Sequence, residues 1–447
     1  MTDLRRRAAG PFLLAVIVLA SACGGPAPTA APSSAAPTAS PLPTATASPS
    51  AATGTPGPSS SDPNAALYTS IESQVVALRG LDLKTPVQRD VLDKAGLRDY
   101  ITNSFNQDNP KSLVDATETL YKALLLVPQD ASLESLYVEL LTSQVVGLYD
   151  DKTRKMYVVS QTGAIGPSEE VAYAHEFTHA LQDQHFGLRS VVGDAKDQGD
   201  RTLARTALVE GDATLLMSLW AQANLTPAQL AEVAGSSDPA SQAVLAQMPA
   251  ILRESLMFPY TGGLSLALSD YVKGGFAAVD QQFATPPDTT EQVLHPDKLA
   301  SREPAVPVSF PSDLAARLGA GWTVPMEDTL GEFQLEILLR NAGGIAGDVS
   351  STAAAGWGGD RVALVEGPAG AVGVALDTAW DTANDAKEFA SALSGLAGKL
   401  KAAGRSVSVL TPSAKRVVLL TGESAATVSR LADALGLAGV AARDLAG

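Results

Sequence analysis

The chain has 447 residues, of which 45% are hydrophobic and 18% are charged, and its formal net charge at pH 7 is −16. This length is sufficient for two domains, and the apolar content is ordinary for a globular protein with a sizeable core. The acidic balance argues against a nucleic-acid-binding protein, which would normally carry a basic face. The single cysteine, Cys23, excludes an intrachain disulfide.

The N-terminus predicts an exported lipoprotein. Three arginines at positions 5–7 precede the apolar run PFLLAVIVLASA, and Cys23 follows that run directly. This order is typical of a secretory signal peptide over residues 1–22, and LASAC resembles a bacterial lipobox, although Ala20 stands where leucine is usual. We therefore expect lipidation of Cys23 and anchoring to the outer face of the cell membrane. An ordinary signal peptide with an unmodified cysteine is the alternative.

A tether is expected between this anchor and the folded region. After Cys23, the segment up to residue 62 consists almost wholly of Pro, Ala, Ser, Thr and Gly. Such a segment cannot bury enough apolar surface to offset the entropy of ordering, so it predicts a flexible spacer over residues 23–62. The folded region then begins near residue 63.

From about residue 67 to residue 141, apolar residues at spacings of three and four predict several helices. The period then changes, because VVGLYDDKTRKMYVVS (145–160) contains two β-prone runs around DDKT, which predicts a hairpin. The next segment, GPSEEVAYAHEFTHALQDQ (166–184), predicts a helix that starts at Pro167 and Ser168, with Ser168 as the N-cap.

The predicted helix carries a metal-binding pattern. His175 and His179 are four residues apart, so their imidazoles project from one helix face. Together with Glu176 they form HExxH, in which two imidazoles bind Zn²⁺ and the glutamate is the general base for zinc-activated water that attacks a carbonyl. Two partly buried helix histidines without a metal are the alternative.

A catalytic zinc ion takes a third protein ligand and keeps one position open. His185 lies where the metzincin pattern HExxHxxGxxH has its third histidine, but Gln182 replaces the glycine that turns the chain, so we interpret His185 as a surface or outer-sphere residue. Glu210 lies on a second predicted helix, RTLARTALVEGDATLLMSLWAQA (201–223), which is apolar on most sides. An unpaired buried carboxylate is costly, so we predict Glu210 as the third ligand, with Asp212 as a candidate supporting acceptor. A salt-bridged or protonated Glu210 is the alternative.

Five segments occur in a defined order along the chain: GLYDDKTRKMYVVS, HEFTHALQDQHF, ALVEGDAT, TTEQVLHPDKL and AAAGWGGDR. With these segments the chain resembles, over roughly residues 68–390, a family of bacterial secreted or lipid-anchored proteins described as zinc metallopeptidases of the gluzincin type. The resemblance implies a zinc site with Glu210 at the family's EG-A position. It implies less about the substrate.

Two further residues are candidates for catalysis. Many zinc peptidases use a histidine or tyrosine to stabilise the oxyanion formed during attack on a carbonyl, and His295 and Tyr260 could act in this way. For His295, a loop histidine that caps local structure beside Pro296 is an equal alternative. The hairpin at 144–160 could offer a strand edge to an extended substrate.

After about residue 356 the pattern predicts two β–β–α units. The expected fold class is therefore α+β: a mainly helical, zincin-like domain over 63–355 with a hairpin before the active-site helix, and a small C-terminal domain over 356–447. The C-terminal domain contains no His or Cys, so we expect it to serve packing or partner binding.

The function expected from these features is a zinc-dependent hydrolase, foremost a peptidase, that acts on protein or peptide substrates and contacts the membrane through its N-terminal lipid. One alternative is a zinc hydrolase with another kind of substrate. A non-catalytic envelope lipoprotein with a structural or vestigial zinc site and a partner-binding C-terminal domain is the other, although a structural site has no need for a base such as Glu176. Cleavage specificity and oligomeric state stay open.

Overall fold

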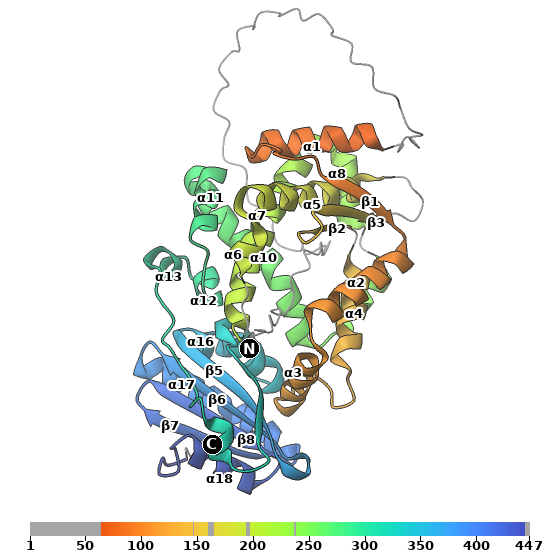
Figure 1. The fold of residues 1–447 in the computed structure, drawn as a ribbon. Helices are drawn as coiled ribbons and strands as arrows, with labels where there is room; N and C mark the ends of the chain where they lie inside the picture. Colours follow the sequence, from red (N-terminus) through yellow and green to blue (C-terminus); the bar gives the residue numbers. More distant parts are fainter. Residues whose placement is uncertain (1–63, 146, 160–164, 194–196, 237, 443–447) are drawn as a thin grey trace, which may run out of the picture.

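The computed structural model describes residues 64–145, 147–159, 165–193, 197–236 and 238–442, and it has the mixed α+β character that was predicted (Figure 1). The expected signal peptide (1–22), the expected lipidation site Cys23 and the expected tether (23–62) lie outside the described residues. Within the described ranges, no helix combines the length and the apolar character that crossing a membrane requires.

The N-terminal two thirds of the chain form a helical part with one small sheet. Its helices are α1 (Ala65–Arg79), α2 (Lys94–Asp108), α3 (Lys111–Ala123), α4 (Leu133–Gln144), α5 (Pro167–Phe186), α6 (Leu188–Val192), α7 (Gly199–Asn224), α8 (Pro227–Gly235), α9 (Pro239–Gln247), α10 (Ala250–Gly274), α11 (Phe276–Ala284), α12 (Thr290–Leu294) and α13 (Pro296–Ser301). Its strands are β1 (Gln88–Leu92), β2 (Gly147–Asp150) and β3 (Lys155–Val159), in the order β1-β3-β2.

The predicted hairpin is confirmed, because β2 and β3 pair antiparallel around the turn at 151–154. Strand β1 was not predicted, and it pairs parallel with β3. Its segment, QRDVL, is mostly exposed and carries two charged residues, so it lacks the apolar alternation that identifies a strand in sequence. Its conformation is set by its partner strand.

Helix α5 presents the HExxH residues from its middle. The N-cap is Gly166, two residues before the predicted Ser168, because Pro167 suits the first helical position and Glu169 Oε2 accepts a hydrogen bond from Gly166 N at 3.0 Å. It runs without a break through Gln182 to Phe186 and ends at Gly187, whose φ of 70° is left-handed.

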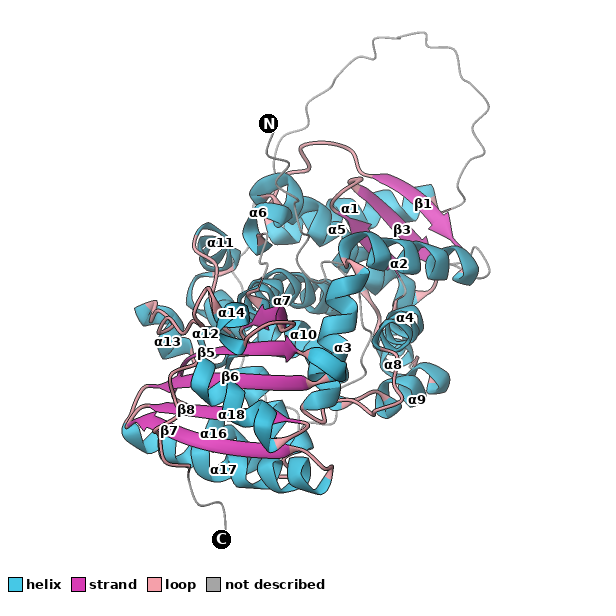
Figure 2. Cartoon of the chain, turned by 60° about the horizontal axis from the view of Figure 1, so that its bottom comes forward, coloured by secondary structure: helices cyan, strands magenta, loops and turns pink. Residues whose placement is uncertain are grey.

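The C-terminal part, which we call the sheet unit (residues 314–434), contains a five-stranded antiparallel sheet in the order β4-β5-β6-β8-β7 (Figure 2). The strands are β4 (Thr323–Asp328), β5 (Trp357–Glu366), β6 (Val372–Trp380), β7 (Ser406–Ser413) and β8 (Arg416–Gly422). The helical segments are α14 (Leu314–Leu318), α15 (Gly331–Ile337), the π-helix η1 (Leu338–Ala342), α16 (Gly347–Ala354), the 3₁₀ turn η2 (Pro368–Gly370), α17 (Ala383–Ala402) and α18 (Ala425–Ala434).

The two predicted β–β–α units are found as β5–β6–α17 and β7–β8–α18. The predicted boundary at residue 356 differs from the structure, because β4 precedes it and yet pairs with β5. The hydrophobic cores are also not divided as they would be in two separate domains. Val362 and Leu364 of β5 pack in one cluster with α17 and with residues of α3 and α10, whereas Ala363 and Val365 face α14 and α18. The helical part and the sheet unit therefore share a core.

Helices α7 and α10 approach closely at a pair of glycines, beside the residues of interest. A Cβ atom added at Gly211 would lie 2.1 Å from Gly263 O, and one added at Gly263 would lie 2.0 Å from Ala207 O. No other residue fits this crossing without moving a backbone. Gly211 follows Glu210 directly, and Gly263 lies about one turn after Tyr260, so the crossing places these two side chains in one region.

Gly211→Ala should therefore destabilise the protein by at least about 1–3 kcal/mol, the usual cost of overpacking a core. The matched control is Gly398→Ala in the interior of α17, where an added Cβ meets nothing within 4 Å. That change should be neutral or should stabilise the helix by about 0.5–1 kcal/mol. Urea midpoints of both variants measure the difference, and equal losses would contradict the role of the crossing.

Candidate metal centre

Three ligand atoms from two helices converge in the interior. His175 and His179 come from α5 and Glu210 from α7, and all three are buried; we call them the metal triad. His175 Nε2 lies 3.0 Å from His179 Nε2 and 3.1 Å from Glu210 Oε2, and His179 Nε2 lies 3.3 Å from the same oxygen. Tetrahedral zinc with bonds of about 2.0–2.1 Å places its ligand atoms about 3.3 Å apart, so the spacing and the donor set fit such an ion.

The Glu210 carboxylate stabilises positive charge within the metal triad. Burial opposes ionisation of Glu210, but the two imidazoles more than offset this effect and lower its pKa to about 2. Burial lowers the pKa of His175. Burial also works against protonation of His179, yet the Glu210 carboxylate raises the pKa of that imidazole to about 9. A buried carboxylate that faces two imidazole nitrogens is a cation site by its charge as well as by its geometry.

An outer layer of hydrogen bonds orients His179. Its Nδ1 lies 2.8 Å from Gln182 Oε1, an arrangement in which Nδ1–H donates and Nε2 is left to act as a ligand. Gln182 Nε2 donates in turn to Asp212 Oδ2 at 2.8 Å and to Val209 O at 3.0 Å. Asp212, the candidate supporting acceptor, therefore connects to His179 through Gln182.

Arg79 extends this layer from a distant segment and was missed by sequence reasoning. Its Nε and Nη2 donate to Asp212 Oδ2 at 3.1 and 3.0 Å, and Nη2 also donates to Asp280 Oδ1 of α11 at 2.6 Å. The side chain is fully buried. An arginine after the apolar stretch QVVAL was the one available signal, because a buried guanidinium needs carboxylate partners. Gln182 was considered in the sequence only as a missing glycine.

Glu176 lies beside the metal triad and contacts the hairpin. Its side chain is buried, and Oε2 accepts a hydrogen bond from Tyr149 N of β2, one of the two edge strands of the small sheet, at 2.5 Å. Oε1 has no hydrogen-bond partner among the described residues. Burial, with a contribution from Glu210, raises the pKa of Glu176 to about 8. A carboxyl group tuned in this direction is suited to exchange a proton near neutral pH.

Tyr260, one of the two predicted catalytic candidates, lies next to the metal triad. Its ring centroid is 6.1 Å from that of His175, with an interplanar angle of 28°. Tyr260 and Glu210 line a common cavity of about 390 Å³. Glu210 also borders a second cavity of about 20 Å³ on the side of Tyr149 and Asp150, which has room for about one water molecule.

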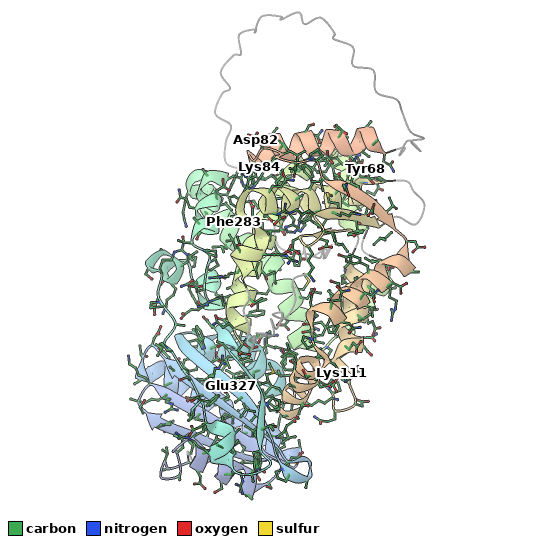
Figure 3. The ribbon with its side chains drawn as sticks, viewed as in Figure 1. Tyr68, Asp82, Lys84, Lys111, Phe283 and Glu327 are labelled. Carbon is green, nitrogen blue, oxygen red and sulfur yellow. The ribbon has the colours of Figure 1, made fainter. Side chains whose placement is uncertain are left out.

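His185 does not join the metal triad, in agreement with its interpretation as an outer residue. The unbroken helix carries its ring away, and Nε2 lies 2.7 Å from Asp82 O, in the segment after α1 (Figure 3). The metzincin-like arrangement would need a turn at Gln182, and the structure has α-helix there. Gln182 is instead a partner of His179.

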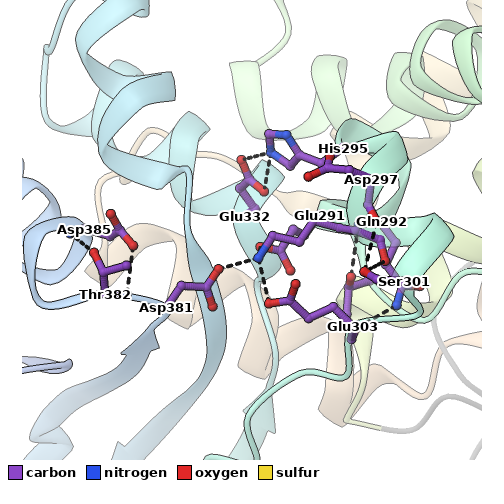
Figure 4. A network of polar contacts seen from close by, with 12 residues as sticks. Glu291, Gln292, His295, Asp297, Ser301, Glu303, Glu332, Asp381, Thr382 and Asp385 are labelled. Carbon is purple, nitrogen blue, oxygen red and sulfur yellow. Dashed lines mark hydrogen bonds and ion pairs between the residues drawn. The ribbon is translucent and has the colours of Figure 1, made fainter.

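His295, the other predicted catalytic candidate, lies outside the metal triad and outside the cavity that Glu210 lines. Its Nε2 contacts Glu332 Oε1 at 2.8 Å, within the network shown in Figure 4. Lys298 of the same TTEQVLHPDKL segment pairs with Asp381 of the sheet unit. The segment therefore joins the helical part to the sheet unit, and the contact with Glu332 of α15 places His295 in this joint. A histidine between a helix end and a proline looks the same in sequence whether it joins elements or serves catalysis.

The other end of the TTEQVLHPDKL segment contacts helix α7. Thr290 N donates to Asp200 Oδ1 at 3.1 Å, near the start of α7. Glu210 is ten residues further along that helix (210 − 200), which is about 15 Å at 1.5 Å per residue. Gly331 at the start of α15 lies against the same carboxylate, since a Cβ there would be 1.7 Å from Asp200 Oδ1.

The joint should make stability depend on pH. The hydrogen bond to Glu332 raises the pKa of His295 above its usual value, with smaller contributions from Glu291 and Asp297. The stabilisation is therefore fully present below about pH 6.5, the unfolded value, and is lost as pH rises through the folded pKa. Because the imidazole is 37% exposed, we expect only about 0.2–1 kcal/mol. Urea unfolding should show His295→Gln closer to the unmodified protein at pH 9 than at pH 6, and a constant difference would contradict the pairing.

Comparison with known proteins identifies one family match. The model of a family described as "Domain of unknown function (DUF8575)" matches residues 317–433, a range that includes all five strands of the C-terminal sheet. The metal triad lies outside the matched range. The comparisons with curated proteins and with solved structures gave no match.

Proposed function

We propose that the protein is a zinc-dependent hydrolase, foremost a peptidase, whose metal is held by His175, His179 and Glu210. The observation that carries the proposal is the convergence of these three buried ligand atoms within 4.8 Å of one another. A fourth ionisable group, Glu176, directly follows His175 in helix α5. Two imidazoles and one carboxylate are the ligand set of several hydrolytic zinc sites.

The chain's own residues have the following roles in this proposal. A bound zinc ion would supply a Lewis acid for the substrate carbonyl and would lower the pKa of water. Glu176 accepts a proton on its unpartnered oxygen and passes it to the leaving amine. Tyr260, beside His175, is the candidate donor to the developing oxyanion. Gln182 keeps His179 in the ligand tautomer.

A structural zinc site is a less suitable interpretation of the same residues. Structural sites are usually closed by four protein ligands, whereas catalytic sites keep a position open. Among the described residues the group consists of three. The water-sized cavity beside Glu210 also offers space at the site.

Metal content and hydrolysis test the proposal together. Purified protein should contain about one zinc ion per chain, as three ligands imply, and should hydrolyse casein. A chelator should abolish the activity, and added zinc should restore it. Stoichiometric zinc in the His175→Ala/His179→Ala variant would exclude the site, and full zinc without hydrolysis across a broad peptide library would favour the non-catalytic alternative.

We also propose that Cys23 carries a lipid that anchors the protein to the outer face of the cell membrane. The support is the order of the arginines, the apolar run and the lone cysteine. Cys23→Ser should move the protein from the membrane fraction to the soluble exported fraction. An unchanged membrane fraction would point to another attachment.

A further inference from the structure

The cavity that begins at Glu210 and Tyr260 continues into the boundary between the helical part and the sheet unit. Its volume of about 390 Å³ is within the range of small-molecule and side-chain pockets, about 300–1,000 Å³. Helices α3, α4, α7 and α10 line one side, and β4 and α15 line the other (Figure 3, where Lys111 marks the start of α3 and Glu327 lies on β4). Pro110 and Ser112 at its rim are exposed, so the cavity can be reached from solvent.

The walls are mainly apolar. Leucine, proline, tyrosine and methionine side chains form most of the lining, among them Leu113, Leu120, Leu203, Leu252, Leu256 and Met326. Such walls favour the burial of apolar side chains at about 25 cal/mol per Å² of area removed from water. A ligand that reaches the metal triad can therefore gain binding energy along this cavity.

The charges of the side chains that line the walls disfavour an anionic group away from the metal triad. None of the described residues that line the cavity is Lys, Arg or His, and the acidic ones are Asp197, Glu210, Glu327 and Asp328. Glu327 is paired with Arg361 at 3.1 Å, and Asp328 Oδ1 accepts from Gly199 N at 2.7 Å. Along the walls, away from the metal triad, the carboxylate of a peptide C-terminus or of a fatty acid would lose its hydration without gaining a cationic side chain as partner.

The polar groups of the lining favour a peptide over an acyl chain. Thr117, Thr202 and Thr206 each donate their hydroxyl hydrogen to a carbonyl one turn earlier in their own helix. Each hydroxyl oxygen keeps acceptor capacity. Backbone N–H groups of a peptide can use these acceptors, whereas an acyl chain would desolvate them without replacement.

We propose that this cavity is the side-chain pocket of the metal site and that it takes an internal, uncharged peptide segment with bulky apolar residues next to the cleaved bond. The inference rests on the proposed function, because it names the substrate class of the same site. The sheet unit sets part of the specificity, since Met326 of β4 and Leu330 line the pocket. The joint from Thr290 to Lys298 holds that wall against α7.

Binding is tested separately from turnover by using the zinc-loaded full chain with Glu176→Gln. The probes are three fluorescent peptides of equal length with blocked ends, whose central pair is Leu-Phe, Gly-Ser or Glu-Glu. We expect the Leu-Phe peptide to bind at least about tenfold more tightly than either of the others, since each methylene in an apolar pocket changes affinity about 10–200-fold. Equal affinities for the three peptides would overturn the inference.

Variants of α10 locate the binding in the cavity. Leu256→Trp fills the pocket and should weaken the Leu-Phe peptide at least about tenfold without changing zinc content. Leu268→Trp, on the same helix but with a 46% exposed side chain, is the matched control and should leave the affinity unchanged. If Leu256→Trp does not fold, Leu256→Ala serves instead, because the larger pocket should shift the preference from Leu-Phe towards Trp-Trp. An unchanged preference in a folded variant would overturn the assignment.

Two further results separate this inference from its alternatives. Dodecanoate should not displace the Leu-Phe peptide, and displacement at a comparable concentration would overturn the peptide assignment in favour of a lipid. Zinc-loaded protein with an intact Glu176 is then given the same peptides. Hydrolysis of all three at equal rates would overturn the pocket while leaving the peptidase proposal in place. Selective binding without any hydrolysis would support the pocket and count against the peptidase proposal.

Discussion

Glu176→Gln should keep the fold and the zinc content while lowering peptidase turnover about 10²–10⁴-fold, the usual contribution of a general base. The glutamine preserves the shape of the side chain, and its carbonyl oxygen can still accept from Tyr149 N, 2.5 Å from Glu176 Oε2 in the structure. Thermal stability should be equal or slightly higher, because a neutral amide replaces a carboxyl group that is costly to ionise in this interior. Casein turnover, metal analysis and thermal unfolding of one preparation measure the three quantities.

Glu170→Gln is the matched control for this change. It makes the same Glu-to-Gln replacement in the same helix, five residues before His175, where Glu170 is only half-buried. Its turnover and zinc content should equal those of the unmodified protein. Near-normal turnover in zinc-loaded Glu176→Gln would exclude Glu176 as the base, and loss of zinc in that variant would assign it to metal binding instead.

Glu210→Gln should lower zinc affinity by more than about 100-fold. Partners outside the ligand sphere already contribute about 10–100-fold to metal affinity, and in the proposed site Glu210 would be a direct ligand and would neutralise part of the charge of the cation. The charge of Glu210 is important because the two imidazoles that lower its pKa to about 2 are the other two residues of the metal triad. Competition with a chromophoric zinc chelator measures the affinity.

His185→Ala provides the contrast. This ring contacts Asp82 O and is not part of the metal triad, so zinc affinity should change by less than about twofold. That change is smaller than the effect of losing a hydrogen-bond partner of a ligand, which is about 10–100-fold. Zinc loss in His185→Ala together with zinc retention in Glu210→Gln would reverse the ligand assignment towards a metzincin-like site.

The sequence by itself determined the elements whose cause is local. The i, i+4 spacing places His175 and His179 on one helix face wherever that helix lies in the fold. The apolar helix around Glu210 and the change of period at the β2–β3 hairpin depend on neighbours within a few residues, and the structure has both. The N-cap was misplaced from Gly166 to Ser168 because several residues of GPS can begin a helix, and only the actual geometry selects one.

Other features were decided by tertiary structure alone. Arg79 meets Asp212 across 133 positions of the chain, and β1 becomes a strand only through its pairing with β3. No local pattern encodes such partners, since they depend on how whole elements are placed. The same holds for the two catalytic candidates. The glycine crossing of α7 and α10 puts Tyr260 against His175, whereas the contact with Glu332 draws His295 into the joint with the sheet unit.

The cavity is the clearest product of tertiary structure. Its walls come from α3, α4, α7, α10, β4 and α15. The periodicity of each element predicts that element alone and not its position next to the others. The sequence predicts a separate C-terminal domain after residue 356, apart from the metal site, because the pattern there changes to two β–β–α units without histidine. The structure instead pairs β4 with β5 and brings Met326 into the lining that Glu210 shares. Candidate metal ligands can thus be predicted from spacing along helices, but the cavity beside them is formed by surfaces that meet only when distant segments pack together.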